Sequence, residues 1–554
     1  MDPKFFPAPV DFRGWLEAHH DKEEELWVGY YKKAAKKPSI DWPQSVDEAL
    51  CFGWIDGLRK WLLQKTTPMR YHPLFILLLL LPTAYISCQP ENPALEERIH
   101  QIENRLQPAI LIAGQKEAGQ FNIYERMKHH KVPGLSIAFV NDGKIEWARG
   151  YGYLSYDSLT PVDSLTLFQA ASISKPVAAL AALRLVQEGK LQLDKDVNTY
   201  LKDWQVEASS FTEGNPVTLE RLLTHTAGLT VHGFGGYAQG DSVPSLVQIL
   251  NGEKPANSER IEPDTFPGSI WRYSGGGYTL MQKMAEDVTG KPFPQVMQEL
   301  VLRQIGMKNS TYEQPFPERY HAHASIGHRP DGEVVEGNWH TYPEVAAAGL
   351  WTTPSDLARY IIEVQQSLKG ESNRVLSQQM TEKMLAKHLG DWGLGPALGG
   401  EGDSLRFSHG GANEGYRCQM MGFARRGQGV VLMSNSDNGI ALIGEVLRGI
   451  SDVYGWGIYT SQTKEAISLE PTQLEQFAGK YRLNEEIDLE VSLKEKQLWV
   501  KQMWDGAEYE LYPESELSFF ETEEGIVFRF GQDEDGGING FSVYDGAYQF
   551  EKME

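Results

Sequence analysis

Cysteine and positive charge are both scarce in this chain. Its 554 residues include three cysteines, Cys51, Cys88 and Cys418, and they lie far apart. Such spacing excludes a disulfide framework and a thiolate metal centre, so we expect Cys51 and Cys418 to be buried as small apolar side chains. The formal net charge is −23, and no basic stripe occurs anywhere. Nucleic acid is therefore excluded as a partner.

The apolar run over residues 74–81 is too short to cross a bilayer, which takes about 20 helical residues. It follows Met69-Arg70 and precedes small, neutral residues that lead to Cys88. A charged start, a short apolar core and a cysteine at the cleavage point are typical of a bacterial lipoprotein signal. A lipid on Cys88 would anchor the exported protein to a membrane, in the periplasm or at the outer membrane or cell surface, if translation starts at Met69. Tyr85 stands where leucine is usual, and a plain secretory signal or anchor is the alternative.

The length predicts two to four domains. The patterns along the chain divide it into residues 1–66, a signal segment over 69–88, a large part over 89–460 and a tail over 468–554. From residue 465 to the end there are 22 acidic and 7 basic side chains, so 15 of the 23 excess negative charges lie in the last 90 residues. The tail is thus predicted to be a separate acidic domain.

The segment before the signal has the pattern of folded protein. Helices are predicted over 12–26 and 46–52, and a strand over 27–31. The runs Leu26-Trp27-Val28-Gly29-Tyr30-Tyr31 and Phe52-Gly53-Trp54-Ile55-Asp56-Gly57 resemble the YdeI-like, OmpD-associated family over about residues 12–60, and the resemblance stops at Lys60. This implies a truncated module, present through a gene fusion or a gene-model artefact. A working cytoplasmic module is the alternative.

The large part alternates between strand and helix patterns. We expect a helix over 95–128, a hairpin whose strands 135–140 and 144–148 flank Asn141-Asp142-Gly143, strands over 416–423 and 429–433, and a helix over 440–453. Helical patterns and loops fill most of 176–344. Strands at both ends with helices between them predict an α+β fold, in which an antiparallel sheet is flanked by helices and carries a helical insert.

The acidic tail shows short alternating runs separated by turn residues. Strands are predicted over 477–483, 487–493, 497–501, 508–511, 518–521, 526–530 and 540–543. This pattern indicates a small all-β barrel or sandwich. The tail has no cluster of histidine, serine and lysine, so we assign it no chemistry.

Ser172 and Lys175 stand three residues apart where a helix is predicted to begin. One helical turn places the hydroxyl and the amine on the same face. A serine becomes a good nucleophile when a neighbour takes its proton, and a lysine can do so when burial keeps it partly neutral. The free N–H groups at a helix start can also stabilise an oxyanion. The pair alone is weak evidence, because Ser-x-x-Lys recurs by chance.

Two further stretches complete the constellation. Tyr273 is followed by Ser274 and three glycines, which allow close backbone approach. His409 lies in Ser408-His409-Gly410-Gly411-Ala412 at the entry to a predicted strand. An edge of that strand can direct the N–H of Ala412 to the same point as the N–H of Ser172, and these two amides would form an oxyanion hole.

In this order and at these distances, the three stretches resemble the serine β-lactamase-like superfamily, nearest to class C β-lactamases and the related D,D-peptidases and esterases, over about residues 126–454. The resemblance implies Ser172 as the acylated serine, Lys175 and Tyr273 as its proton-transfer partners, and His409 and Gly411 along the sheet edge beside the substrate. Gly275 stands where the family has asparagine, and His409 replaces the usual lysine. Both departures argue against efficient β-lactam turnover.

We therefore expect a serine hydrolase that acts on an ester or amide of a small molecule or peptide, including D-amino-acid substrates, without cofactor or metal. The alternative is a non-catalytic cell-wall-binding or sensor lipoprotein that keeps the penicillin-binding fold. His321, His323, His328 and His340 lie close in sequence, but no acidic or cysteine ligands accompany them at metal spacing, so we expect them to line a loop or the substrate.

Overall fold

The computed structural model describes residues 4–7, 9–19, 26, 28–29, 92–114, 120–484, 487–503 and 506–553. The chain forms two compact units, residues 1–89 and 90–554. The predicted helix over 46–52, the signal segment 69–88, Cys51 and Cys88 lie outside the described residues.

In the first unit, helix α1 (Pro9–His19) accompanies two short strands that pair in parallel, β1 (Lys4–Phe5) and β2 (Val28–Gly29). Phe6, Phe12 and Leu16 form its buried apolar cluster. Of the helix predicted over 12–26, residues 12–19 are confirmed and residues 20–25 lie outside the described residues. The helix begins earlier than predicted, at Pro9, because proline is tolerated in a first helical turn, where no backbone N–H is needed. The strand predicted over 27–31 is represented by β2.

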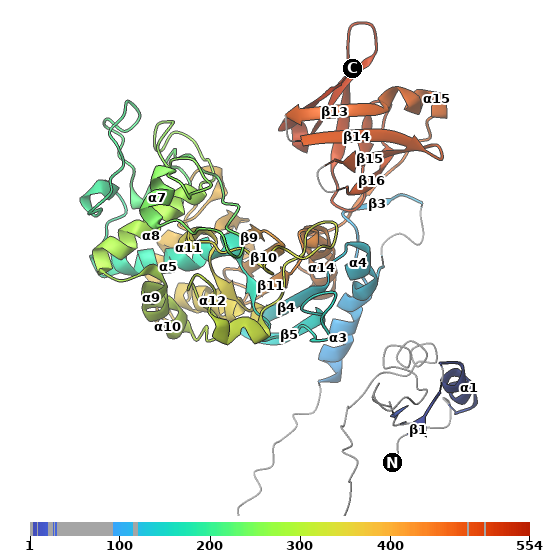
Figure 1. Cartoon of the computed structure of the whole chain (residues 1–554), viewed down its shortest axis with the longest axis horizontal. Coiled ribbons are helices and arrows are strands. Elements are labelled where there is room, and N and C mark those ends of the chain that lie inside the picture. The colour runs from blue at the N-terminus through green and yellow to red at the C-terminus, as the bar shows by residue number, and fades with distance from the viewer. Residues whose placement is uncertain are drawn as a thin grey trace, which may run out of the picture. The chain divides into compact units, whose positions relative to one another are not determined.

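The second unit is built on a six-stranded antiparallel sheet with strand order β5-β4-β11-β10-β9-β8 (Figure 1). The strands are β4 (Gly134–Asn141), β5 (Lys144–Gly152), β8 (Ala397–Gly399), β9 (Arg406–Asn413), β10 (Tyr416–Phe423) and β11 (Gly429–Ser434). The early strand β4 pairs with the late strand β11, as predicted from the strands at both ends of this part. Residues 153–396, between β5 and β8, supply most of the helices.

The predicted hairpin is confirmed as β4 and β5. Asp142 and Gly143 connect them with φ of 50° and 68°, a left-handed pair that suits the twist of a tight hairpin. Successive side chains of β4 alternate between two cores. Ile137 and Phe139 face one apolar cluster, while Ala138 packs with Ala358 in another. Both faces of the sheet are therefore covered.

Helices cover the sheet on its two faces, as Figure 1 shows. Helices α3 and α14 share a core with one face of β4 and β11, and α12 packs on the other face. The α-helices of this unit are α3 (Pro93–Glu103), α4 (Ile123–His129), α5 (Ser174–Gln187), α6 (Leu219–Leu223), α7 (Leu246–Asn251), α8 (Gly275–Thr289), α9 (Phe293–Met297), α10 (Arg303–Ile305), α11 (Val345–Ala348), α12 (Pro354–Leu368), α13 (Gln378–Met384), α14 (Gly439–Tyr454) and α15 (Pro471–Leu474).

The single helix predicted over 95–128 is wrong. The segment contains two helices, α3 and α4, separated by strand β3 (Ile110–Ile112). Pro108 explains the break, because proline lacks an N–H and disfavours helical geometry in the residue before it. Strand β3 instead pairs in parallel with β12 (Gln462–Lys464), which follows the sheet domain.

The acidic tail is a closed eight-stranded barrel, which confirms the predicted small all-β domain. Its strands are β13 (Gly479–Asn484), β14 (Ile487–Lys494), β15 (Gln497–Gln502), β16 (Glu508–Pro513), β17 (Ser518–Phe520), β18 (Val527–Gln532), β19 (Ile538–Val543) and β20 (Tyr548–Lys552). Seven were predicted. The eighth, β20, closes the barrel between β13 and β19.

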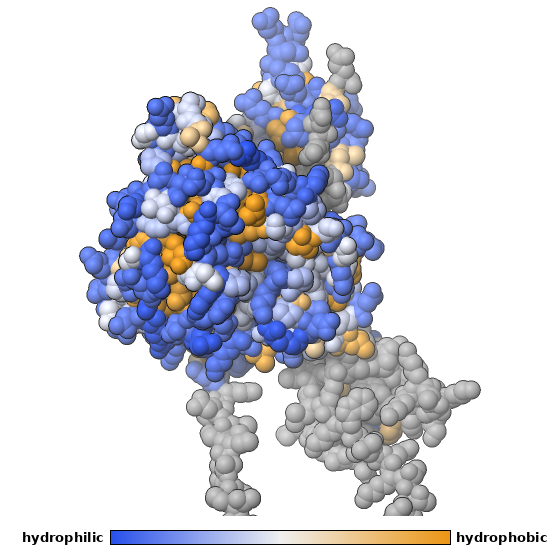
Figure 2. Space-filling model, turned by 60° about the vertical axis from the view of Figure 1, so that its left-hand side comes forward, coloured by the Kyte–Doolittle hydropathy of each residue, from blue (hydrophilic) through white to orange (hydrophobic). Residues whose placement is uncertain are grey.

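Figure 2 shows one face of the molecule, on which separate apolar patches interrupt a mostly hydrophilic surface. Within the described part of the chain, every helix is too short or too polar to cross a membrane. Cys418 is fully buried, as expected, and its Sγ lies 3.2 Å from the carbonyl oxygen of Gln169.

Candidate active site

Ser172 lies in a one-turn 3-10 helix, Ala171–Ile173, that leads directly into α5. Ala171 has φ of 49°, a left-handed conformation that is unusual for a residue with a side chain. Backbone strain of this kind persists only where the surroundings enforce it, and it concentrates at functional sites. Here the strained turn holds Ser172 in a partly exposed position at the N-terminus of the buried helix α5.

Lys175 is the buried partner of this serine. Its Nζ lies 3.0 Å from Ser172 Oγ and donates a hydrogen bond of 2.9 Å to the carbonyl oxygen of Ala347. The side chain is 2% exposed, and burial lowers the pKa of its ammonium from 10.5 to about 7. Near neutral pH, a large share of this amine is thus free to accept the serine proton.

A second strand pair brings Ala347 to this position. Strands β6 (Phe168–Gln169) and β7 (Trp351–Thr352) pair in an antiparallel manner. Next to them, the N–H of Ala170 donates to the carbonyl of Leu350 over 2.8 Å. The segment before β7 is thereby held against the nucleophile turn.

Tyr273 stands just before α8, whose first turn is capped by Ser274. Its ring centroid lies 4.9 Å from Lys175 Nζ. Burial raises the pKa of the Tyr273 phenol above its usual range, and a hydrogen bond with Ser172 partly opposes that effect. The phenol therefore stays protonated at neutral pH, so it can donate a proton but does not act as a base in the resting enzyme.

The open edge of β9 forms the wall opposite the serine. Pairing between β8 and β9 ends at Ser408, so the edge beyond it faces the nucleophile turn. A Cβ added to Gly411 would lie 2.3 Å from the carbonyl oxygen of Ala170, which shows that the strand approaches as closely as glycine permits. Ala412 follows on the same edge. That its N–H joins the N–H of Ser172 in an oxyanion hole stays a prediction.

His409 is 5% exposed, and its ring lies beside Tyr273 with 6.0 Å between centroids. Nδ1 lies 2.6 Å from the carbonyl oxygen of Gly410, whereas Nε2 has no hydrogen-bond partner among the described residues. Burial, together with the nearby charge of Lys175, lowers the pKa of this imidazole to about 3. At neutral pH, His409 therefore offers the site no positive charge.

Gly275 occupies the first position of α8, and its N–H donates to the carbonyl of His232 over 2.9 Å. A Cβ at this position would lie 3.0 Å from Cε2 of Phe234. The space for a longer side chain is thus already occupied by an aromatic ring. A substrate contact at Gly275 stays a prediction.

An aromatic wall next to Tyr273 escaped the sequence reasoning. Trp271 and Trp392 lie 5.3 Å apart between ring centroids, and Trp392 is 5.9 Å from Tyr273 and 5.6 Å from His409. His225 completes the group at 4.3 Å from Tyr273. Trp271 is close to Tyr273 in sequence, but Trp392 and His225 come from distant segments. No local sequence pattern therefore predicts that they contact Tyr273.

The four histidines between residues 321 and 340 form no metal centre among the described residues. In the described ranges, His321, His323, His328 and His340 belong to no group of three or more potential metal ligands. His328 is buried, and its Nε2 lies 3.1 Å from Ser155 Oγ. Cys88, the predicted lipid site, lies outside the described residues.

Residues 4–73 match a family model described as a domain of unknown function, DUF8412. The predicted YdeI-like resemblance is not supported by this match and stays a prediction. The matched range also runs a few residues past the start of the predicted signal segment at Met69.

Comparison with known proteins shows which family the larger unit of the chain resembles. The chain is similar to esterase EstB of Burkholderia gladioli, with 28% identity over 42% of this chain and 60% of the esterase. It is also similar to a β-lactamase of Providencia stuartii, with 30% identity over 44% of this chain and 58% of that β-lactamase. It thus spans about three fifths of these relatives' length. The octameric penicillin-binding protein homologue from Pyrococcus abyssi shares the fold, with a TM-score of 0.52 and 22% identity over 78% of this chain and 98% of that one. Residues 122–448 match the beta-lactamase family model, and the chain therefore belongs to the β-lactamase family.

Proposed function

We propose that this protein is a serine hydrolase that forms an acyl-enzyme on Ser172 from an ester or amide substrate. The observation that carries the proposal is the buried amine of Lys175, 3.0 Å from Ser172 Oγ and with a pKa of about 7. A nucleophile in contact with a base that is partly neutral at physiological pH is the arrangement that acyl transfer requires.

The proposed reaction assigns a proton transfer to each of Lys175 and Tyr273. Neutral Lys175 takes the proton of Ser172 as Oγ attacks the substrate carbonyl carbon, and the N–H groups of Ser172 and Ala412 receive the developing oxyanion. The protonated phenol of Tyr273 supplies a proton to the leaving alcohol or amine and is reprotonated from Lys175. Water then attacks the acyl carbon and gives a proton to Lys175, which passes it to Ser172 Oγ as the acyl–oxygen bond breaks and the acid is released.

The surroundings favour an uncharged, apolar substrate. A β-lactam carries a carboxylate, but His409 is neutral above about pH 3 and offers it no fixed charge. Phe234 closes the space beside Gly275 in which an amide side chain would hold a substrate carbonyl. The aromatic wall of Trp271 and Trp392 instead offers apolar area beside the nucleophile. We infer preference for esters or amides with apolar groups and weak or no β-lactamase activity.

Two probes applied to the wild-type protein and to Ser172→Ala test this function. A fluorescent fluorophosphonate should label the wild type alone, because the reagent phosphonylates an activated serine. A fluorescent penicillin should label it weakly or not at all. Equal fluorophosphonate labelling of both proteins, or labelling of neither, would overturn the proposal; absence of labelling would point to the non-catalytic sensor. Rapid turnover of penicillin would overturn the inferred selectivity.

The apolar preference has its own test. On p-nitrophenyl esters with acyl chains of two to eight carbons, kcat/KM should rise with chain length, and Trp271→Ala should flatten that rise while the acetate rate stays close to wild type. Leu159→Ala removes a side chain that is 92% exposed and serves as the control. An unchanged chain-length profile in Trp271→Ala would contradict the role of the aromatic wall.

We also propose, from the sequence, export with a lipid anchor on Cys88. Mass analysis of the N-terminus of the native protein tests this, with a diacylated peptide beginning at Cys88 as the expected result. A mature product that retains Trp27 and Trp54 would contradict it.

A further inference from the structure

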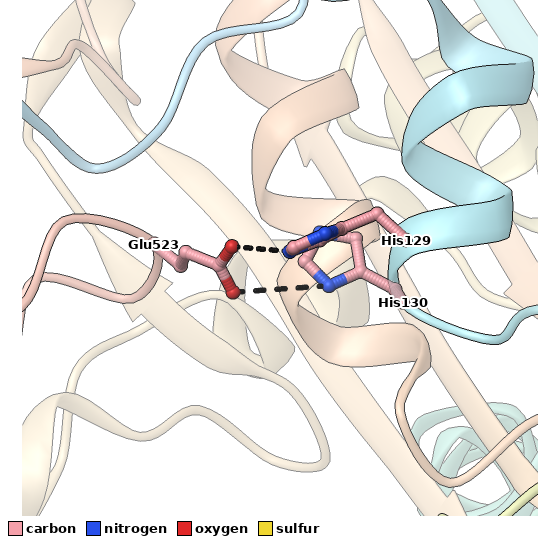
Figure 3. A group of neighbouring side chains, drawn as sticks. All are labelled: His129, His130 and Glu523. Carbon is pink, nitrogen blue, oxygen red and sulfur yellow. Dashed lines mark hydrogen bonds and ion pairs between the residues drawn. The ribbon is translucent and has the colours of Figure 1, made fainter. Parts of the chain in front are cut away.

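A group of three possible metal ligands lies where the barrel meets the sheet domain. His129 and His130 stand at the end of α4, and Glu523 lies in the turn between β17 and β18 (Figure 3). One ligand atom from each falls within 4.8 Å of the others. The Nε2 of His129 is 2.5 Å from Glu523 Oε1, and the Nδ1 of His130 is 4.0 Å from Oε2.

The ring of His130 is oriented by a second carboxylate. Its Nε2 lies 3.2 Å from Oε1 of the fully buried Glu445 and 3.1 Å from Nη2 of Arg126. Nδ1, on the other side of the ring, faces Glu523 across 4.0 Å. This distance is too long for a hydrogen bond, and it must shorten to about 3.3 Å for the two atoms to bind one tetrahedral cation with bonds of about 2 Å each. A carboxylate behind a histidine is also the partner that orients metal-ligating histidines.

The turn that carries Glu523 is held by hydrogen bonds from its own backbone to a buried carboxylate. The carboxylate of Glu521, 1% exposed, accepts N–H bonds from Glu523 at 2.7 Å and from Ile526 at 2.5 Å. The carbonyl of Glu523 accepts a bond of 3.2 Å from the N–H of Ala109. A ligand held in this way needs little reorganisation before it binds a metal.

The local charge permits a cation. Arg126 lies 3.0 Å from Glu523, but it is also paired with Glu445 at 2.6 Å, and Arg448 donates to the Glu523 carbonyl. The two guanidinium groups face three carboxylates, those of Glu445, Glu521 and Glu523. The carboxylates thus outnumber the guanidinium groups by one around the cluster.

We propose that His129, His130 and Glu523 bind one divalent transition-metal cation, best matched by Zn²⁺. Two imidazole nitrogens and a carboxylate oxygen suit zinc, and the half-exposed side of His129 leaves a fourth position to water. On binding, His129 exchanges its hydrogen bond to Glu523 for a bond to the metal. This site departs from the sequence-based expectation of a metal-free protein, and it joins α4 to the barrel.

Zinc titration of the full chain, stripped with a chelator, tests the site by calorimetry and by native mass spectrometry. The wild type should bind one equivalent. His129→Ala and Glu523→Gln should weaken that binding by more than the about 10–100-fold typical of losing an outer partner. His100→Ala, which removes an exposed histidine from α3, should leave it unchanged. Substitution with Co²⁺ should give the intense visible absorption of a four-coordinate site.

Thermal unfolding of each variant verifies that it is folded. If Glu523→Gln is unstable, zinc binding by His129→Ala, which removes only a half-exposed ring, tests the site instead. A wild type that binds no stoichiometric zinc would overturn the proposal, and the cluster would then be only an ion-pair network. Zinc binding that survives both substitutions would also overturn it. Neither result depends on whether Ser172 is catalytic.

Discussion

Replacement of Lys175 by methionine should abolish acylation and yet stabilise the fold at neutral pH. Methionine has a similar length and no charge. Burial lowers the pKa of Lys175 from 10.5 to about 7, and each pKa unit corresponds to about 1.36 kcal/mol, so the buried amine, half neutral in the folded protein at pH 7, costs roughly 4 kcal/mol there. Loss of its hydrogen bond leaves the Ala347 carbonyl unpaired, at a cost of about 1–3 kcal/mol. Lys175→Met should therefore raise the free energy of unfolding by roughly 1–3 kcal/mol.

The pH dependence of that gain identifies its cause. Between pH 7 and 10.5 the unfolded wild type holds a proton on Lys175 that the folded protein has lost, so wild-type stability rises with pH across this window. The advantage of Lys175→Met should thus shrink by about 2.3 kcal/mol from pH 7 to pH 9, because the folded lysine still holds half a proton at pH 7. Urea unfolding followed by circular dichroism at pH 7, 8 and 9 measures the difference.

Lys190→Met provides the control, because Lys190 is 52% exposed and paired with Glu188. It should change the unfolding free energy little at any of these pH values. If Lys175→Met proved less stable than the wild type at pH 7, or if its advantage stayed constant with pH, the buried-amine account of the site would be refuted.

Three further outcomes follow from the site. The acylation rate should rise with pH through about 7 and then level off, as Lys175 loses its proton, and stopped-flow labelling with an activated ester measures it. Tyr273→Phe should lower kcat by about 10²–10⁴-fold with little change in KM, because it removes a proton relay but keeps the ring; an unchanged kcat would exclude that role. Gly411→Ala should displace the nucleophile turn at Ala170, cost about 1–3 kcal/mol and reduce fluorophosphonate labelling. The neighbouring control Gly410→Ala should behave like the wild type, because its new Cβ would lie 3.4 Å from Oε1 of Gln419, an ordinary contact with a flexible side chain.

The sequence predicted those features that depend on short-range geometry. The hairpin of β4 and β5 follows from alternating side chains around Asp142-Gly143, and the contact of Ser172 with Lys175 follows from one helical turn. The family motifs brought Tyr273 and His409 to the same site. Most barrel strands were also visible, because each is a short alternating run between turn residues.

Other features depend on contacts between distant parts of the chain, which no local pattern reveals. Trp392 reaches Tyr273 from a segment more than 100 residues away, and His129 meets Glu523 across 394 positions. The helix predicted over 95–128 failed for a different reason: its apolar spacing was correct around Ile99 and Ile102, but α3 ends at Glu103, and Pro108 prevents one helix from continuing through to α4.

The parallel pairing of β3 with β12 has a practical consequence for dissecting the protein. The two strands lie at the chain's entry to and exit from the sheet domain, so the intervening residues 113–461 form a loop closed at its base. Ile110 and Ile112 in turn pack against Phe520 of the barrel. A fragment cut near residue 460 would leave β3 without its partner and expose these isoleucines to water, which invites aggregation. Expression of the sheet domain with its barrel, from Pro93 to the C-terminus, keeps that closure intact.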